Sequence, residues 1–488
     1  MPSLLPRLRP IFGAIETGGR LVPFMQRRRR GGAMARGRFT SALRNVLIAA
    51  GFAIGQTIAT GSASAQMLLR DAEIEGWLRE KSDPILEVAG IEPESIDILL
   101  VGDPTLNAFA GGRIMGFHTG LFTTAQTPNE IEAVIAHEVA HISGGHTARS
   151  DAVAAAATTP MLLSLVLAAG AIAAGAPQAG IGILGLGQTV GIANYLKYSR
   201  SQESGADQAG ITFLEKLGKS GKGAIDLWSR MSNSQIIRGR KINPYLVTHP
   251  LPLDREEALR ARVEASPLYN IVDSPEEMYR LHMIQAKIYG FLQETRLTLR
   301  QYPKTDTSDP ARYARAVAFY RAADIASAQE EIDALIEKYP DVPYFHELKG
   351  QMLFEFGRIE ESIAPHRRSV ELAPGQSLFR VNLGRSLLGR EDVEGAKLAI
   401  EELRRAILLE PDSAFAWFEL SRAYGLTGDI PMAHLATAES KYHGGRVGEA
   451  AQFAARALKG LPPGSPEARR AQDVLAAARA KAQQARRR

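Results

Sequence analysis

The 488-residue sequence contains no cysteine. This absence excludes a thiol nucleophile, a disulfide framework, an iron–sulfur cluster and a zinc site built from thiolates. It indicates no particular compartment, because a chain of this length can bury a large core without disulfides. With 45% hydrophobic and 23% charged residues the composition is that of a globular protein, and the length favours two or three domains.

Lysine is also absent from residues 1–65, which hold ten arginines and a single acid. The rest of the chain therefore carries a net negative charge, so the basic pI gives no reason to expect a nucleic-acid partner. The features of this leader follow the order of a secretory signal peptide. Arginines come first, then an apolar run from Val46 to about Ile58, and then small residues that end at Ala65. We expect cleavage after Ala65 and export to the periplasm, with Met34 as an alternative start.

The chain after this leader divides by its pattern into four segments. Residues 66–270 mix helix and strand signals, residues 271–309 form a helical connector, and residues 310–470 are helical and repetitive, before a charged tail at 471–488. Pro340, Pro374 and Pro411 each follow a helical run, at intervals of 34 and 37 residues, and Gly350 and Gly384 are also 34 apart. This period resembles tetratricopeptide repeats, whose stacked helix pairs present a concave face to protein partners.

The motif His137-Glu138-Val139-Ala140-His141 is the strongest chemical signal. Thr127 as N-cap, followed by Pro128 and Glu130, predicts the start of its helix, and Gly144-Gly145 predicts the end. Two imidazoles one helical turn apart can bind one tetrahedral zinc ion. Glu138 falls among the apolar positions of this helix, where a carboxylate is costly unless it serves the chemistry, as a proton acceptor for the attacking water does.

A third metal ligand has to come from elsewhere in the chain. Position 147, where one class of zinc protease has its third histidine, is Thr147. Glu203 and Asp207 lie one turn apart on a later helix, so Glu203 can bind the metal while Asp207 orients a ligand imidazole. From spacing alone, an acidic pair on a solvated helix face is the alternative.

These motifs together resemble the zinc metallopeptidase family of the CAAX prenyl proteases and HtpX heat-shock proteases. Members carry H-E-x-x-H, a downstream E-x-x-x-D and an N-A-F segment, which here is Asn107-Ala108-Phe109. A signal peptide in front and tetratricopeptide repeats behind resemble the periplasmic, beta-barrel assembly-enhancing branch. The resemblance implies one zinc ion per chain, held by His137, His141 and Glu203. It also implies that Glu138 is the catalytic base and that Asp207 supports a ligand.

Two further segments are candidates for the site, and the first of them, around His249 and Arg255, belongs to the same resemblance. His249 either stabilises the oxyanion during catalysis or occupies a fourth zinc position and keeps the enzyme latent. We expect Arg255, close behind it, to contact substrate. Leu106 to Phe117 predicts a hairpin around Gly111-Gly112, whose edge could pair with substrate backbone while Asn107 bonds it. His118 and His146 are expected to be structural or exposed.

Residues 152–196 carry no charge at all. Because His141 and Glu203 flank this segment and must reach the same metal, it crosses a membrane either twice or not at all. We favour apolar helices or a lid that covers the site and touches a membrane peripherally. A helical hairpin inside the bilayer is the alternative.

The predicted fold is α+β: a zincin-like metalloprotease domain, mostly helical with a small sheet, followed by an all-α tetratricopeptide-like array. The predicted function is an exported zinc endopeptidase that degrades misfolded or misassembled envelope proteins, with outer-membrane β-barrel proteins as clients. Its partners are unfolded substrates and, through the repeats, the outer-membrane assembly machinery. One alternative is a chaperone or assembly scaffold with a largely latent protease site, and another is a membrane-embedded processing protease.

Overall fold

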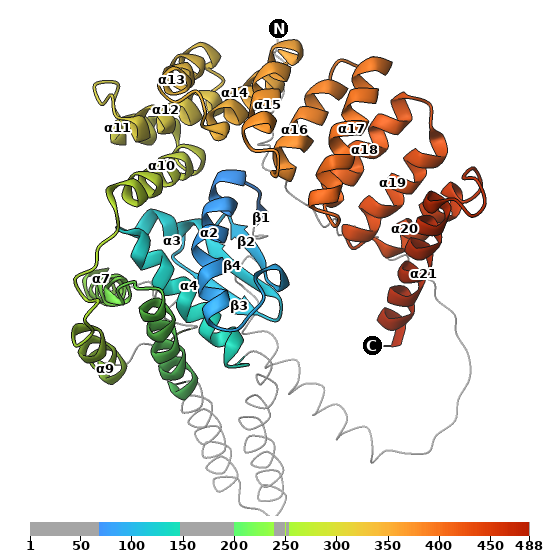
Figure 1. Cartoon of the computed structure of the whole chain (residues 1–488). Helices are drawn as coiled ribbons and strands as arrows, with labels where there is room; N and C mark the ends of the chain where they lie inside the picture. The colour runs from blue at the N-terminus through green and yellow to red at the C-terminus, as the bar shows by residue number, and fades with distance from the viewer. Residues whose placement is uncertain (1–67, 147–199, 239–248, 250–252, 488) are drawn as a thin grey trace, which may run out of the picture.

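The computed structural model describes residues 68–146, 200–238, 249 and 253–487 (Figure 1). The leader with its cleavage site at Ala65 and the uncharged segment 152–196 therefore lie outside the described residues. Among the helices that are described, none combines the length and the apolar character that a membrane crossing requires.

A small sheet organises the first domain, with strand order β1-β2-β4-β3. Its strands are β1 (Leu68–Leu69), β2 (Asp97–Val101), β3 (Ala108–Gly111) and β4 (Ile114–His118). β2 and β4 are parallel, whereas β3 and β4 form an antiparallel hairpin. Gly112 closes this hairpin with a positive φ of 62°, a conformation that glycine adopts without strain. The hairpin predicted from Leu106 to Phe117 is confirmed.

Helices cover the sheet and complete the core of the first domain. They are α2 (Ala72–Val88), α3 (Thr119–Thr124), α4 (Pro128–Ser143), a helix over residues 200–216, α7 (Lys222–Arg238) and α9 (Leu253–Glu264), with a short 3-10 turn, η1 (Pro93–Ser95), before β2. The core joins Leu86 of α2, Phe117 of β4 and Ile135 of α4, none of which is exposed by more than 1%. The predicted mostly helical domain with a small sheet is thereby confirmed.

Helix α4 carries the metal-binding motif and is almost completely enclosed. Thr127 is its N-cap and accepts a hydrogen bond from the backbone N–H of Glu130 at 3.3 Å. The Glu130 carboxylate in turn accepts one from the N–H of Gln126. All residues from Pro128 to His141 are buried, so every polar side chain on α4 needs a partner inside the protein.

The second half of the chain is a helical array that arches over the first domain (Figure 1). α10 (Pro275–Leu292) and α11 (Thr295–Gln301) lie in the predicted connector. The helices that follow are α12 (Asp309–Arg321), α13 (Ile325–Lys338), α14 (Pro343–Glu355), α15 (Ile359–Leu372), α16 (Ser377–Leu388), α17 (Val393–Leu409), α18 (Ala414–Leu426), α19 (Ile430–His443), α20 (Val447–Ala457) and α21 (Pro466–Arg487). The recurring glycines let neighbouring helices approach: a Cβ on Gly384 would lie 2.8 Å from a Leu403 side-chain carbon. The predicted all-α repeat array is confirmed.

Buried charges join the two halves at the start of α2. Lys287 of α10 lies 2.7 Å from the Asp71 carboxylate and 3.1 Å from that of Glu73, and Tyr313 of α12 donates a hydrogen bond to Glu73 at 2.8 Å. Burial alone would lower the pKa of Lys287, but the neighbouring carboxylates outweigh it and raise the pKa well above its usual value. The array is therefore anchored to the first domain by a buried lysine that keeps its charge beside two carboxylates.

His366 of α15 makes the stability of the array depend on pH. It is 2% exposed, and its Nδ1 lies 2.8 Å from the Ser386 hydroxyl. Burial, together with the Arg385 charge, lowers the pKa of His366 from 6.5 to about 3. Below pH 6.5, His366 therefore binds a proton in the unfolded chain but not in the folded chain. The contribution of His366 to stability is complete above pH 6.5 and is lost progressively as the pH falls towards 3.

Replacing His366→Gln should therefore reduce the loss of stability between pH 7 and pH 5. The wild type should lose about 2 kcal/mol more than the variant over this interval, since each pKa unit corresponds to about 1.4 kcal/mol. Urea unfolding at both pH values, followed by helical circular dichroism, measures the difference. His282→Gln, at an exposed histidine on α10, is the matched control. Equal losses in wild type and His366→Gln would contradict the assignment.

Candidate metal centre

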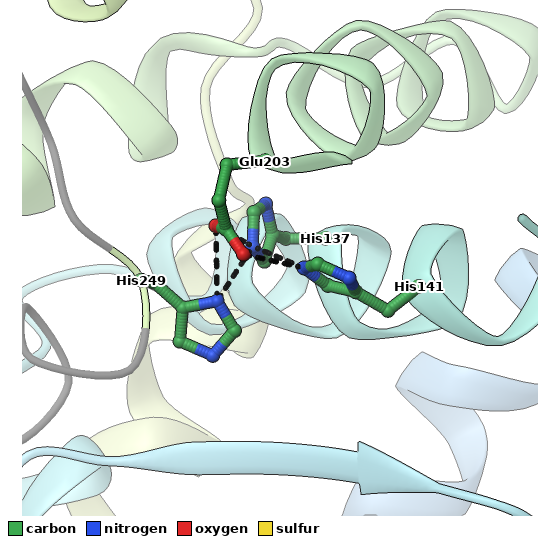
Figure 2. Close-up of side chains that lie close together, drawn as sticks. All are labelled: His137, His141, Glu203 and His249. Carbon is green, nitrogen blue, oxygen red and sulfur yellow. Dashed lines mark hydrogen bonds and ion pairs between the residues drawn. The ribbon is translucent and has the colours of Figure 1, made fainter. Parts of the chain in front are cut away.

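Four side chains from three separate parts of the chain converge inside the first domain. They are His137 and His141 of α4, Glu203 of the helix over residues 200–216, and His249 (Figure 2). One ligand atom from each lies within 4.8 Å of all the others. His137 Nε2 is 3.1 Å from His141 Nε2 and 3.3 Å from Glu203 Oε2, and Glu203 Oε1 is 3.4 Å from His141 Nε2.

His249 lies between the other three residues of the cluster and Glu138. Its Nδ1 is 3.0 Å from Glu203 Oε2 and 3.2 Å from His137 Nε2. Its Nε2 points the other way and is 3.5 Å from Glu138 Oε1. Glu138 itself is 1% exposed, and this oxygen has no hydrogen-bond partner in the part of the chain that the structure describes. A buried carboxylate oxygen without a hydrogen-bond partner is uncommon in a folded protein and points to a functional role.

A second layer of contacts orients the ligands. Asp207, one turn after Glu203, lies 3.0 Å from His137 Nδ1, which leaves Nε2 of that ring facing the cluster. Arg255 of α9 donates to Asp207 at 2.7 Å through Nη2 and through Nε as well, and its Nη1 is 3.2 Å from Glu203 Oε2. The Arg255 guanidinium also stacks on the Trp228 ring, 5.4 Å from its centroid.

The contacts within the cluster keep both of its carboxylates ionised. Burial would raise the pKa of Glu203, but its contacts with His137, His141 and His249 outweigh burial and hold the pKa far below the usual range. For Asp207, burial is likewise outweighed, here by hydrogen bonds from Arg255 and His137, so its pKa is lowered. Both carboxylates therefore stay ionised in a volume almost closed to water, where their attraction for positive charge is strong.

The donor set is also the one that a divalent transition metal requires. Three imidazole nitrogens and a carboxylate oxygen are ligands that zinc binds in a tetrahedral arrangement. The imidazole of His137 has its other nitrogen on a carboxylate, the arrangement commonly found for metal-binding histidines. The residues present therefore fit a single metal ion.

The remaining predicted site residues lie around the cluster. Asn107 is half-buried just before β3, and its side-chain oxygen has no hydrogen-bond partner among the described residues. Arg255 is 7% exposed and contacts Asp207 and Glu203, while its contact with substrate stays a prediction. His118 is buried, as a structural residue would be.

The contact of His146 with a metal ligand was not predicted from the sequence. Its Nδ1 lies 3.0 Å from His141 Nδ1, so it supports the second ligand of α4. Gly144-Gly145 is the sequence feature that could have indicated this contact. Gly145 has a positive φ of 63°, so the chain can fold back over the end of the helix there.

Comparison with known proteins gives the same two-part architecture. Residues 72–263 match Peptidase family M48, and residues 313–377 match a tetratricopeptide repeat model. A Vibrio cholerae protein is 26% identical over 303 residues, which are 60% of this chain and 62% of that protein, less than two thirds of its length.

Two further relatives are more completely covered. The beta-barrel assembly-enhancing protease of Yersinia pestis is 25% identical over 361 residues, or 72% of either chain. The protease of the same name from Escherichia coli K12 is 23% identical over 409 residues, which are 82% of this chain and 81% of that protein. The resemblance found in the motifs is thus confirmed: the chain contains a domain that matches peptidase family M48, followed by tetratricopeptide repeats.

Proposed function

We propose that the protein is an exported zinc endopeptidase that degrades misfolded or misassembled envelope proteins. The observation that carries this proposal is the convergence of His137, His141 and Glu203 on one point beside the buried carboxylate of Glu138. The names of the relatives support β-barrel proteins of the outer membrane as the clients. The signal-peptide pattern that ends at Ala65 supports export to the periplasm.

The chemistry divides between the metal and the side chains around it. His137, His141 and Glu203 would hold a zinc ion, which would supply a Lewis acid for the scissile carbonyl and for the attacking water. Glu138 accepts the proton of the attacking water and passes it to the leaving nitrogen. Asp207 fixes the ring of His137, and Arg255 holds both carboxylates in place.

The position of His249 supports the latent alternative over a role in stabilising the oxyanion. Its Nδ1 lies among the ligand atoms, and its Nε2 reaches Glu138. The ring therefore fills the space between the metal ligands and the proton acceptor, where a scissile peptide has to lie. Displacement of His249 would admit a substrate.

Substrate backbone has a natural position along the β3–β4 hairpin. β3 is the edge strand of the sheet on the side where α4 packs. An extended peptide can pair with such an edge, and Asn107, with an unsatisfied amide oxygen just before β3, can accept a backbone hydrogen bond from it. Exposed strands of an unassembled β-barrel protein would suit this mode of binding.

A chaperone or assembly scaffold is the second candidate. The repeat array offers a surface for protein partners, the outer-membrane assembly machinery among them, and His249 within the cluster is compatible with a mostly silent protease. Contact of residues 152–196 with a membrane lies outside the described residues and stays a prediction.

Changing Glu138→Gln should abolish cleavage and leave the metal bound, because the amide keeps the shape of the side chain but cannot accept the proton. We expect cleavage of an unfolded model protein to fall at least 100-fold, the lower end of what general-base catalysis contributes. Elemental analysis of the same preparation should show one zinc per chain. Glu264→Gln, at an exposed carboxylate on α9, is the control.

Two results would count against this function. Cleavage by Glu138→Gln at the wild-type rate would remove the proposed mechanism. If Glu138→Gln restored the biological role in cells that lack the protein, the scaffold would be favoured instead.

Changing Asp207→Asn should weaken zinc binding by about 10- to 100-fold, since outer-shell carboxylates orient the ligand imidazole and increase its basicity. Competition with a chromophoric chelator measures the affinity. Asp226→Asn, on α7 and outside the cluster, should bind zinc as the wild type does. An unchanged affinity of Asp207→Asn would show that His137 needs no support from Asp207.

A further inference from the structure

A chamber lies between the first domain and the repeat array, separate from the metal centre. One wall comes from β1, the start of α2 and residues 93–100, and the other from Gly375–Leu378 and Leu409–Asp412 at the turns before α16 and α18. Its volume is about 880 Å³, which falls within the range of roughly 300–1,000 Å³ typical of ligand clefts. None of the four residues of the metal cluster lines it.

Carboxylates dominate the charges of this chamber. Two guanidinium groups, those of Arg70 and Arg79, face six acids: Glu75, Asp83, Glu94, Asp97, Glu410 and Asp412. Arg70 is held by Glu75 at 2.9 Å and by both oxygens of Glu410, so it links the two walls. Arg79 is bound to Asp83 and to the carbonyl of Pro93.

The acids that remain are not paired with a guanidinium group in this way. Asp97 and Asp412, on opposite walls, are exposed and form no ion pair within the described parts of the chain. The chamber therefore has a negative potential that favours a cationic ligand over an anionic one.

Apolar side chains stay uncovered on both walls. Leu68 of β1 is 42% exposed, Ile114 of β4 is 38% exposed, and Leu409 at the end of α17 is 47% exposed. These residues face the same space as the acids. A ligand that covers them needs apolar groups in addition to positive charge.

The chamber also reaches backbone at the edge of the sheet. β1 pairs only with Leu100 and Val101 of β2. Asp97 donates its N–H towards β4, to the carbonyl of Arg113, so the backbone groups of Ile98 point to the opposite side. Ile98 lines the chamber and is paired with Met115 of β4, but on its other side no residue of β1 pairs with it among the described residues. The backbone N–H and C=O that point to that side are therefore one donor and one acceptor for an extended main chain.

We propose that this interdomain chamber binds an extended polypeptide segment in which basic residues alternate with apolar ones. Basic side chains lie against Asp97 and Asp412, apolar ones against Leu68 and Leu409, and the main chain bonds to Ile98. The chamber is then a second binding site for protein clients, remote from the bond that is cut. Only the description of the ligand as a client rests on the proposed function.

The binding test uses the Glu138→Gln protein, so that no peptide is cleaved. The probe is a fluorescein-labelled decapeptide of alternating valine and lysine, followed by fluorescence anisotropy. The double variant Asp97→Asn, Asp412→Asn should weaken binding about tenfold, the sum expected for two partly exposed charge pairs. Glu401→Gln, at an exposed acid of α17 outside the chamber, should leave the affinity unchanged.

A second variant and a second peptide keep the test independent of folding effects. Leu409→Lys adds a positive charge to the array wall and should also weaken binding, with helical circular dichroism confirming that the array is folded. A decapeptide of alternating valine and glutamate should bind at least tenfold more weakly than the lysine peptide. Equal binding of the two peptides, or full affinity in the double variant, would overturn the proposal. Because cleavage is absent throughout, neither result bears on whether the wild type is a protease.

Discussion

The enclosure of α4 is the constraint on which the rest of the site depends. Burial from Pro128 to His141 removes two imidazoles and the Glu138 carboxylate from water, where each would otherwise be stabilised. The surrounding side chains replace the hydrogen bonds and the charge stabilisation that water would have supplied. Asp207 bonds to His137, and Arg255 neutralises the carboxylates next to it. In this low-dielectric setting the charges act strongly on one another, so a bound cation and a proton acceptor can lie side by side without being screened.

The sequence predicted the parts of this site that depend on local spacing. His137, Glu138 and His141 follow from a helical period and a capped start, and the β3–β4 hairpin follows from its glycines. Glu203 needed the resemblance, because a pair of acids one turn apart has many uses. The contact of Arg255 with Glu203, of His146 with His141 and of Lys287 with Asp71 was not predictable. Those pairs depend on how separate elements pack, which no spacing in one segment encodes.

Ionic contacts at the beginning of α2 determine how the two domains lie. Arg70 bridges to Glu410 at the end of α17, and Asp71 and Glu73 receive Lys287 of the connector. The same few residues thus fix the array at both its first and its later helices. Removal of a partner of Lys287 would leave buried charge unpaired, which is far more costly than the loss of the more exposed pair of Arg70 and Glu410.

The sheet separates two kinds of negative charge. Near α4 the carboxylates are buried and ionised, and they contact the histidines of the metal cluster. This arrangement suits tight binding of one small cation. At the β1–β2 edge, Asp97 and Asp412 are exposed to water. The attraction of each carboxylate for a positively charged side chain therefore contributes little binding free energy, and many such contacts must act together. A long, flexible chain can make several such weak contacts and release them quickly. Under the proposed function, a client held at one edge of the sheet would have a higher effective concentration at the other edge, beside β3 and the metal centre, without a tight complex that would slow its release.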